Sequence, residues 1–303
     1  MSQQHIIIEE QGLRDGMQTI PINVEPERKL LYIQQLIDAG VKRIQVASFV
    51  NPKLVPQMAD AEIICSALPT NNSVIFSGLV LNMKGVERAI KVGLKHLAIS
   101  LSASNTHNIK NANKTIEASK MEFKEMVQLA QSEGITVRGG IQCAFGCRYE
   151  GSIDPQVVYD LTKHHLDCGV PEIALADSTG MGNPTQIKSM MQQIKTFSGN
   201  IPIALHLHNT ENKGYANMIA AIEAGVFQFD TAFGGLGGCP FIQGATGNIA
   251  TEDAVHLLHQ MNYTTGIDIN KVAAISTDFE KVLGKELPGL FYKLMNRSDI
   301  KMN

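Results

Sequence analysis

The chain has 303 residues and a mass of 33.0 kDa, which suffices for one large α/β barrel or for two smaller units. Hydrophobic residues make up 44% and charged residues 18%, as is typical of a globular protein that buries a sizeable core. The formal net charge of -3 provides no basic field for a phosphate backbone, so no nucleic-acid partner is expected.

The N-terminal stretch MSQQHIIIEEQG lacks the basic start, long apolar segment and cleavage site of a secretory signal. No apolar run approaches the roughly 18 residues of a membrane span, so no membrane association is expected. Five cysteines at scattered spacings argue against a disulfide framework and favour a reducing compartment. We therefore expect a cytoplasmic protein.

Short apolar runs alternate along the chain with longer amphipathic segments. The runs expected to form strands cover residues 6–10, 43–49, 74–80, 96–101, 136–141, 172–176, 203–207 and 227–230. The expected helices include residues 25–39, 85–92, 116–133, 154–168 and 212–224, each followed by a glycine. A glycine after a helix is a common C-terminal signal, so the pattern indicates repeated strand–helix units.

About eight such units in a chain of this length predict a TIM (β/α)8 barrel. Near-continuous apolar strands also suit a parallel sheet that is buried on both faces. A doubly wound open sheet would need a Gly-rich phosphate loop after an early strand, and the sequence has none there. Residues from Gly266 onward are expected to form extra C-terminal helices. Because no linker marks a boundary, we expect residues 1–303 to be a single catalytic domain.

His206 and His208 lie two residues apart at the end of a predicted strand. This spacing places both side chains on one face, here the barrel interior, which favours a metal site over a hydrogen-bonded polar pair. Asp15, near the end of the first strand, is a candidate third ligand because the first and last strands of a barrel pair. Such a mixed oxygen and nitrogen set suits Mn²⁺, Mg²⁺ or Zn²⁺.

Arg14 precedes Asp15 and is a candidate donor to a carbonyl or carboxylate oxygen; the alternative is a turn with a surface ion pair. Cys239 lies in a Gly-rich segment after the last strand and is a candidate acid, base or nucleophile. The alternatives are an inert thiol or a phosphate loop, although the P-loop pattern is missing. Cys143 and Cys147 are interpreted as structural.

Several longer motifs accompany these residues from the first strand into the C-terminal region. They are GLRDGMQ at 12–18, SFVNPKLVPQM at 48–58, CAFGCRYEG at 143–151, GLGGCP at 235–240 and GNIATED at 247–253. Together with the histidine pair, they resemble 3-hydroxy-3-methylglutaryl-CoA lyases. That family belongs to the metal-dependent barrel lyases, which also include homocitrate and isopropylmalate synthases.

The resemblance implies that a 3-hydroxy-3-methylglutaryl-CoA-like thioester is cleaved to acetyl-CoA and a keto acid. It implies a divalent cation, Mg²⁺ or Mn²⁺, bound by Asp15, His206, His208 and Asn248. It also implies catalytic roles: Arg14 at the thioester carbonyl, Cys239 in proton transfer, and Asp177 as an acid or base near the reacting hydroxyl. A homo-oligomer, namely a dimer, is the expected assembly.

Departures from the family pattern fall around the substrate. Gln45 stands where the family has a glutamate, Gly140 where it has a tyrosine, Gln142 where a small residue is usual, and Arg148 where it has a proline. With Arg14, these four residues are the predicted substrate contacts. Two other functions stay open: an enzyme that condenses an acyl-CoA with a keto acid, and a catalytically impaired relative that binds a CoA ester or a metal.

Overall fold

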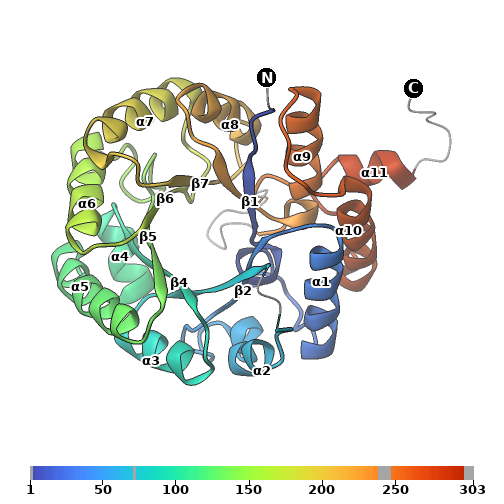
Figure 1. Cartoon of the computed structure of the whole chain (residues 1–303), viewed down its shortest axis with the longest axis horizontal. Helices are drawn as coiled ribbons and strands as arrows, with labels where there is room; N and C mark the ends of the chain where they lie inside the picture. The colour runs from blue at the N-terminus through green and yellow to red at the C-terminus, as the bar shows by residue number, and fades with distance from the viewer. Residues whose placement is uncertain (1–2, 71–72, 238–246, 297–303) are drawn as a thin grey trace.

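The computed structural model describes residues 3–70, 73–237 and 247–296. Eight parallel strands follow one another around a closed barrel, and β8 pairs with β1 to close it (Figure 1). They are β1 (Ile7–Glu10), β2 (Arg43–Ser48), β3 (Ile75–Val80), β4 (His96–Ser102), β5 (Thr136–Gln142), β6 (Glu172–Asp177), β7 (Ile203–Leu207) and β8 (Gln228–Thr231). The predicted TIM barrel is therefore confirmed, and every predicted strand end lies within one residue of the observed end.

Helices connect successive strands of the barrel, and among the described residues three more follow the last strand. They are α1 (Pro26–Asp38), α2 (Ala61–Ser66), α3 (Met83–Lys91), α4 (Asn105–Ala112), α5 (Ile116–Ser132), α6 (Pro155–Asp167), α7 (Pro184–Ser198), α8 (Gly214–Glu223), α9 (Thr251–Gln260), α10 (Ile269–Leu283) and α11 (Phe291–Asn296). No helix in the described part of the chain is long and apolar enough to cross a membrane.

Local sequence signals explain where these helices begin. Pro26, Pro155 and Pro184 occupy first helical positions, where a missing N–H costs nothing. Six helices start with a side chain that accepts a hydrogen bond from the first turn: Asn82, Ser104, Thr115, Asp154, Asn183 and Asp268. These signals determine where each helix begins. They therefore also determine where the loop between the preceding strand and that helix ends, at the mouth of the barrel.

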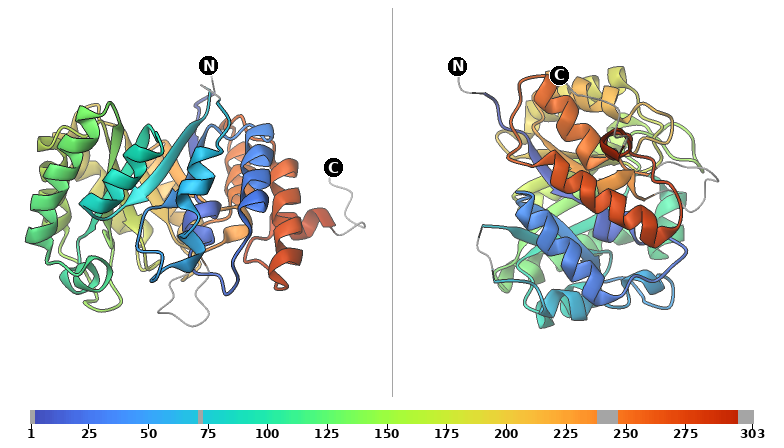
Figure 2. Two further views of the ribbon diagram at one scale, coloured as in Figure 1. Left: turned by 90° about the horizontal axis from the view of Figure 1, so that it is seen from below. Right: turned by 90° about the vertical axis from the view of Figure 1, so that its right-hand side faces the viewer.

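The predicted C-terminal helices are present, and α10 packs against α1. The right-hand view of Figure 2 shows the two helices side by side on the flank of the barrel. Phe279 of α10 meets Tyr32 of α1 edge to face, with ring centroids 5.8 Å apart. Asp278 accepts hydrogen bonds from the Tyr32 hydroxyl at 2.7 Å and from Arg28 at 3.0 Å. These contacts attach the C-terminal helices to the layer of helices that surrounds the barrel.

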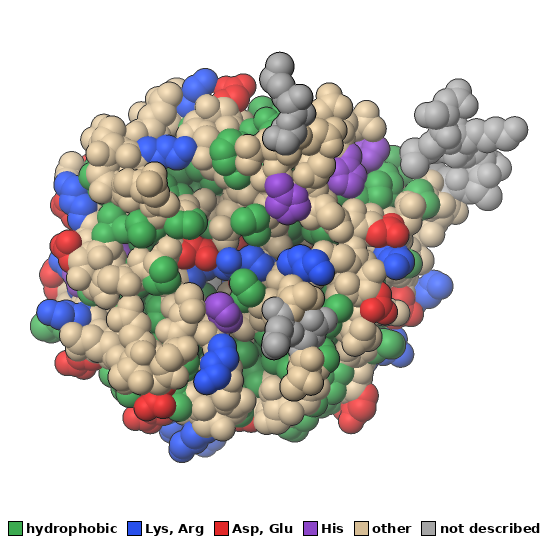
Figure 3. Space-filling view, viewed as in Figure 1, with side chains coloured by type: hydrophobic (Ala, Val, Ile, Leu, Met, Phe, Trp, Pro, Cys, Tyr) green, Lys and Arg blue, Asp and Glu red, His purple; other side chains and the backbone are tan. Residues whose placement is uncertain are grey.

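A cluster of charged side chains fills the end of the barrel where the strands begin. Glu9 and Glu172 each pair with both Arg43 and Arg138, at distances from 2.8 to 3.2 Å. Figure 3 looks onto this end and shows positive and negative side chains gathered at its centre. Because these charges neutralise one another inside the barrel, this end is closed as a structural floor, and the opposite end is available for a site.

Candidate active site

Arg14 and Asp15 lie in a π-helical turn, η1 (Gly12–Gly16), that directly follows β1. Glu10 anchors the turn, since its Oε1 accepts hydrogen bonds from the amides of Gly12 at 2.7 Å and Phe233 at 3.0 Å. Burial raises the pKa of Glu10 to about 7. Asp15 is thus one turn beyond the strand at whose end the sequence placed it, and π turns of this kind recur at functional sites.

Two histidines and one carboxylate converge opposite this turn. The Nε2 atoms of His206 and His208 are 3.0 Å apart. Asp15 Oδ2 lies 3.3 Å from Nε2 of His208 and 3.7 Å from Nε2 of His206. One ligand atom from each of the three buried residues falls within 4.8 Å of the others, which defines a candidate metal site.

Asn248 completes the predicted set from the far end of the chain. Its Nδ2 donates to Asp15 Oδ2 at 2.8 Å and to the Leu236 carbonyl at 2.9 Å, and its backbone bridges to that of His208. The structure therefore brings all four predicted ligands together. Their binding of a metal stays a prediction.

The donor set fits a divalent cation. Two imidazole nitrogens that both act as acceptors repel at 3.0 Å unless a proton or cation lies between them. Asn248 Oδ1 is buried without a hydrogen-bond partner among the described residues, so it remains free to act as a ligand. Burial raises the pKa of Asp15, but the charge of Arg14 and the contact with His208 outweigh burial and hold it well below its usual value. Asp15 is thus an ionised carboxylate at neutral pH, the form that a divalent cation prefers as a ligand.

Arg14 is held by three acceptors. Its Nη1 pairs with Asp15 Oδ1 at 2.5 Å, its Nη2 donates to Gln11 Oε1 at 2.8 Å, and its Nε donates to Gln45 Oε1. Arg14 and Asp15 are each only 8% exposed, so the alternative of a surface ion pair is wrong. Because Gln11 and Gln45 are neutral, Asp15 provides the only carboxylate that contacts this guanidinium among the described residues.

Gly140 faces the barrel interior. A Cβ on Gly140 would lie 2.0 Å from Ser100 Oγ, whereas one on Gly139 would meet His165 in the helical layer. No side chain therefore fits at position 140 while Ser100 keeps its place. Gln142 is half-buried at the end of the same strand.

Two further predicted residues have partners other than the candidate metal ligands. Arg148 is at the rim, where its Nη2 donates to Glu211 Oε1 at 2.7 Å, and its side chain is 36% exposed. Asp177 is buried at the end of β6 and accepts from the Gly182 amide at 3.1 Å. Burial raises the pKa of Asp177, and the hydrogen bond from the Gly182 amide partly opposes this rise. No hydrogen bond in the described residues joins either side chain to Asp15 or the histidines.

Cys239 lies outside the described residues. The Gly-rich segment that leads to it packs closely against two of the candidate metal ligands at Gly237, since a Cβ there would fall 2.7 Å from Asn248 Nδ2 and 3.0 Å from Asp15 Oδ2. Cys143 and Cys147 are buried and free, which agrees with a structural role.

Sequence reasoning missed two residues that bear on His206. Asp230 of β8 places its Oδ2 3.2 Å from His206 Nδ1, and Arg138 of β5 donates to the other oxygen of Asp230 at 2.9 Å. Both are less than a tenth exposed. Each of them could have been noticed in the sequence as a charged residue within an otherwise apolar strand. A charge in that position needs a buried partner.

The barrel and the site together define a class of protein. A carboxylate, two imidazoles and an amide converge beside a buried arginine at the carboxyl ends of parallel barrel strands. That arrangement is typical of metal-dependent TIM-barrel enzymes.

The family is shown by sequence. The model of the HMGL-like family matches residues 5–278, and the chain belongs to this family. It is 41% identical to an (R)-citramalyl-CoA lyase of Chloroflexus aurantiacus over 290 residues, covering 92% of each chain. It is 35% identical to a hydroxymethylglutaryl-CoA lyase of Bacillus subtilis, covering 93% of this chain and 95% of the relative.

A solved structure gives the same result. The HMG-CoA lyase of Acinetobacter baumannii, in complex with coenzyme A and 3-methylmalate, superposes with a TM-score of 0.93 at 36% identity. The match covers 99% of this chain and 98% of that one. The predicted family and enzyme class are confirmed, and the protein is a carbon–carbon lyase.

Proposed function

We propose that the protein is a divalent-metal-dependent lyase that cleaves a 3-hydroxy-3-methylglutaryl-CoA-like thioester to acetyl-CoA and a keto acid. The observation that carries this proposal is the convergence of Asp15, His206 and His208 within 4.8 Å. Asn248 and Arg14 both contact Asp15. Asn248 would supply an amide oxygen to the ion, and Arg14 would supply a positive charge to the substrate.

The metal would be held by Asp15 Oδ2, the facing nitrogens of His206 and His208, and Asn248 Oδ1. This oxygen and nitrogen set supports Mg²⁺ or Mn²⁺. A bound ion supplies Lewis acidity, which lowers the pKa of a substrate hydroxyl at this position.

The protein side chains would then move two protons and stabilise one charge. The base, for which we propose Asp177, takes the proton of the C3 hydroxyl while the C2–C3 bond breaks. The electron pair of that bond passes to C2, and the resulting enolate places negative charge on the thioester oxygen. Arg14 is the fixed cation for that charge, and the Cys239 thiol would return a proton to C2 to give acetyl-CoA.

A second substrate is favoured by the 41% identity to the citramalyl-CoA lyase and by the residues around the site. Citramalyl-CoA also carries a tertiary hydroxyl at C3 of the thioester, but its carboxylate is one methylene closer. The bond that breaks is therefore the same in both substrates. The side chains at positions 45, 140, 142 and 148 would decide which of the two substrates is preferred.

A panel of hydroxyacyl-CoA thioesters tests the proposal. With Mg²⁺ or Mn²⁺, we expect acetyl-CoA to form from 3-hydroxy-3-methylglutaryl-CoA or citramalyl-CoA without a second substrate, and EDTA to stop its formation. Acetyl-CoA and the keto acid are measured together by chromatography. Release of free CoA only after a keto acid is added would identify a condensing enzyme, and no turnover of either kind would identify a binding protein.

Gln45→Glu restores the carboxylate of the family pattern. We expect it to raise kcat for 3-hydroxy-3-methylglutaryl-CoA several-fold, since general-base groups contribute about 10²–10⁴-fold in rate when fully effective. Gln11→Glu is the matched control, because Gln11 and Gln45 are both neutral acceptors of Arg14. A rise of kcat in both variants would mean that any added carboxylate beside Arg14 has this effect, wherever it is placed. If kcat did not rise in Gln45→Glu, the protein would act on a substrate other than 3-hydroxy-3-methylglutaryl-CoA.

A further inference from the structure

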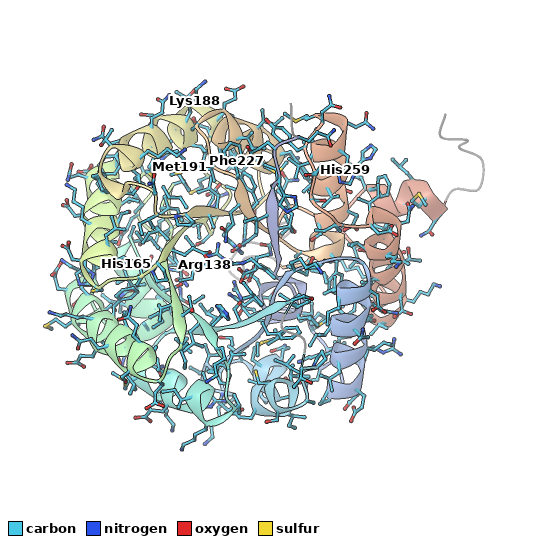
Figure 4. The ribbon with its side chains drawn as sticks, viewed as in Figure 1. Arg138, His165, Lys188, Met191, Phe227 and His259 are labelled. Atoms are coloured by element: carbon cyan, nitrogen blue, oxygen red, sulfur yellow. The ribbon has the colours of Figure 1, made fainter. Side chains whose placement is uncertain are left out.

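A line of buried polar contacts connects the barrel floor with His206. Asp230 divides its two oxygens: Oδ1 accepts from Arg138 Nη2 at 2.9 Å, and Oδ2 lies 3.2 Å from His206 Nδ1. The three residues come from β5, β8 and β7, so only the closed barrel assembles them. Figure 4 shows Arg138 reaching from β5 into the barrel, with His165 on the other side of that strand.

Two glutamates at the start of the barrel strands hold Arg138 in place. Its Nη1 lies 3.2 Å from Glu9 Oε2, and its Nε lies 3.0 Å from Glu172 Oε1. Arg43 pairs with the same two glutamates, at 2.8 Å and 2.9 Å. Of these two arginines, Arg138 is the one that pairs with Asp230, so it connects the floor to the carboxylate beside His206.

The contact at Nδ1 decides which nitrogen of His206 is free. A carboxylate paired with an arginine can only accept hydrogen bonds, so Asp230 requires a proton on Nδ1 of a neutral imidazole. Nε2, which faces His208 Nε2 at 3.0 Å, then keeps its lone pair for a ligand role. Arg138 prevents Asp230 from rotating out of this arrangement, because it holds the other oxygen.

We infer that Arg138 and Asp230 are positioning residues that fix the Nδ1–H tautomer of His206 and aim its Nε2 at the candidate metal site. The inference rests on the proposed metal site and extends it through the barrel to the floor.

Asp230→Asn tests the inference most directly. Arg138 can only donate, so it draws the amide oxygen of the new side chain and turns the amide NH₂ toward His206 Nδ1. The His206 proton should then move to Nε2. We expect ¹⁵N NMR of labelled histidine to show this change of tautomer, and the Kd for Mn²⁺, measured by calorimetry without substrate, to rise by about 10–100-fold.

Arg138→Gln should weaken Mn²⁺ binding by a similar factor, and Arg138→Lys should restore part of it because a positively charged donor to Asp230 remains. Arg43→Gln is the matched control, since Arg43 pairs with Glu9 and Glu172 but makes no ion pair or hydrogen bond with Asp230 in the described part of the chain. We expect Arg43→Gln to lower the Tm and to leave the Kd for Mn²⁺ within about twofold of wild type.

Three results would overturn the inference: an unchanged Kd in Asp230→Asn, equal weakening in the Arg43 and Arg138 variants, or an unchanged His206 tautomer. If Asp230→Asn does not fold, the comparison of Arg138→Lys with Arg138→Gln decides in its place. His208→Ala is measured in parallel, because retention of Mn²⁺ in that variant would refute the metal site itself and hence the proposed function.

Discussion

Replacing His208 with alanine is expected to abolish binding of Mg²⁺ or Mn²⁺ and to reduce thioester cleavage by on the order of 10³-fold or more. Of the two imidazoles, that of His208 lies closer to Asp15 Oδ2, with its Nε2 at 3.3 Å, and it faces His206 Nε2. Without it, one imidazole, one carboxylate and one amide oxygen remain, which is too weak a set to compete with water for Mg²⁺. The measurements are metal content after dialysis and the rate of acetyl-CoA release.

His165→Ala is the control for loss of a buried histidine. His165 is fully buried in α6, where its ring stacks on Phe123 with centroids 3.8 Å apart, on the outer side of β5. That variant should unfold at a lower temperature and keep its metal. Full metal content in His208→Ala would show that the ligand assignment is wrong.

Arg14→Gln is expected to lower kcat by about 10²–10³-fold, the effect of removing one preorganised donor to a developing oxyanion. The affinity for Mn²⁺ should change by less than about tenfold, since Asp15 keeps its contact with Asn248. Arg14→Lys should recover little activity, because Arg14 donates to three separate acceptors through its planar guanidinium. Steady-state kinetics at saturating metal, with calorimetric Mn²⁺ titration, separate the two effects.

The matched control is Arg148→Gln, which removes the same charge at the rim, where Arg148 pairs with Glu211. We expect its effect to fall mainly on KM. If Arg14→Gln weakened metal binding as strongly as His208→Ala does, Arg14 would serve to hold Asp15 rather than to stabilise the enolate.

Much of the fold could be predicted because its signals are local. Apolar runs of strand length, capping residues and the glycine after each helix depend on neighbours a few residues away, so they located every strand of the barrel. The shared face of His206 and His208 follows from the two-residue period of a strand in the same way. Family motifs added Asn248 and Gln45, which no local pattern marks.

Contacts between residues far apart in the chain could not be predicted from local patterns, because they form only when the barrel closes. Asn248 meets Asp15 across 233 residues of chain, and Arg138 meets Asp230 across 92. The burial of Arg14, its contacts with Gln11 and Gln45, and the approach of Ser100 to Gly140 also depend on which strands and turns become neighbours. The strand–helix repeat and the shared face of the two histidines follow from the order of the amino acids alone, because both features are periodic and local. The surroundings of the candidate metal site depend on the tertiary structure, because buried charges and amides find their partners when distant strands close the barrel.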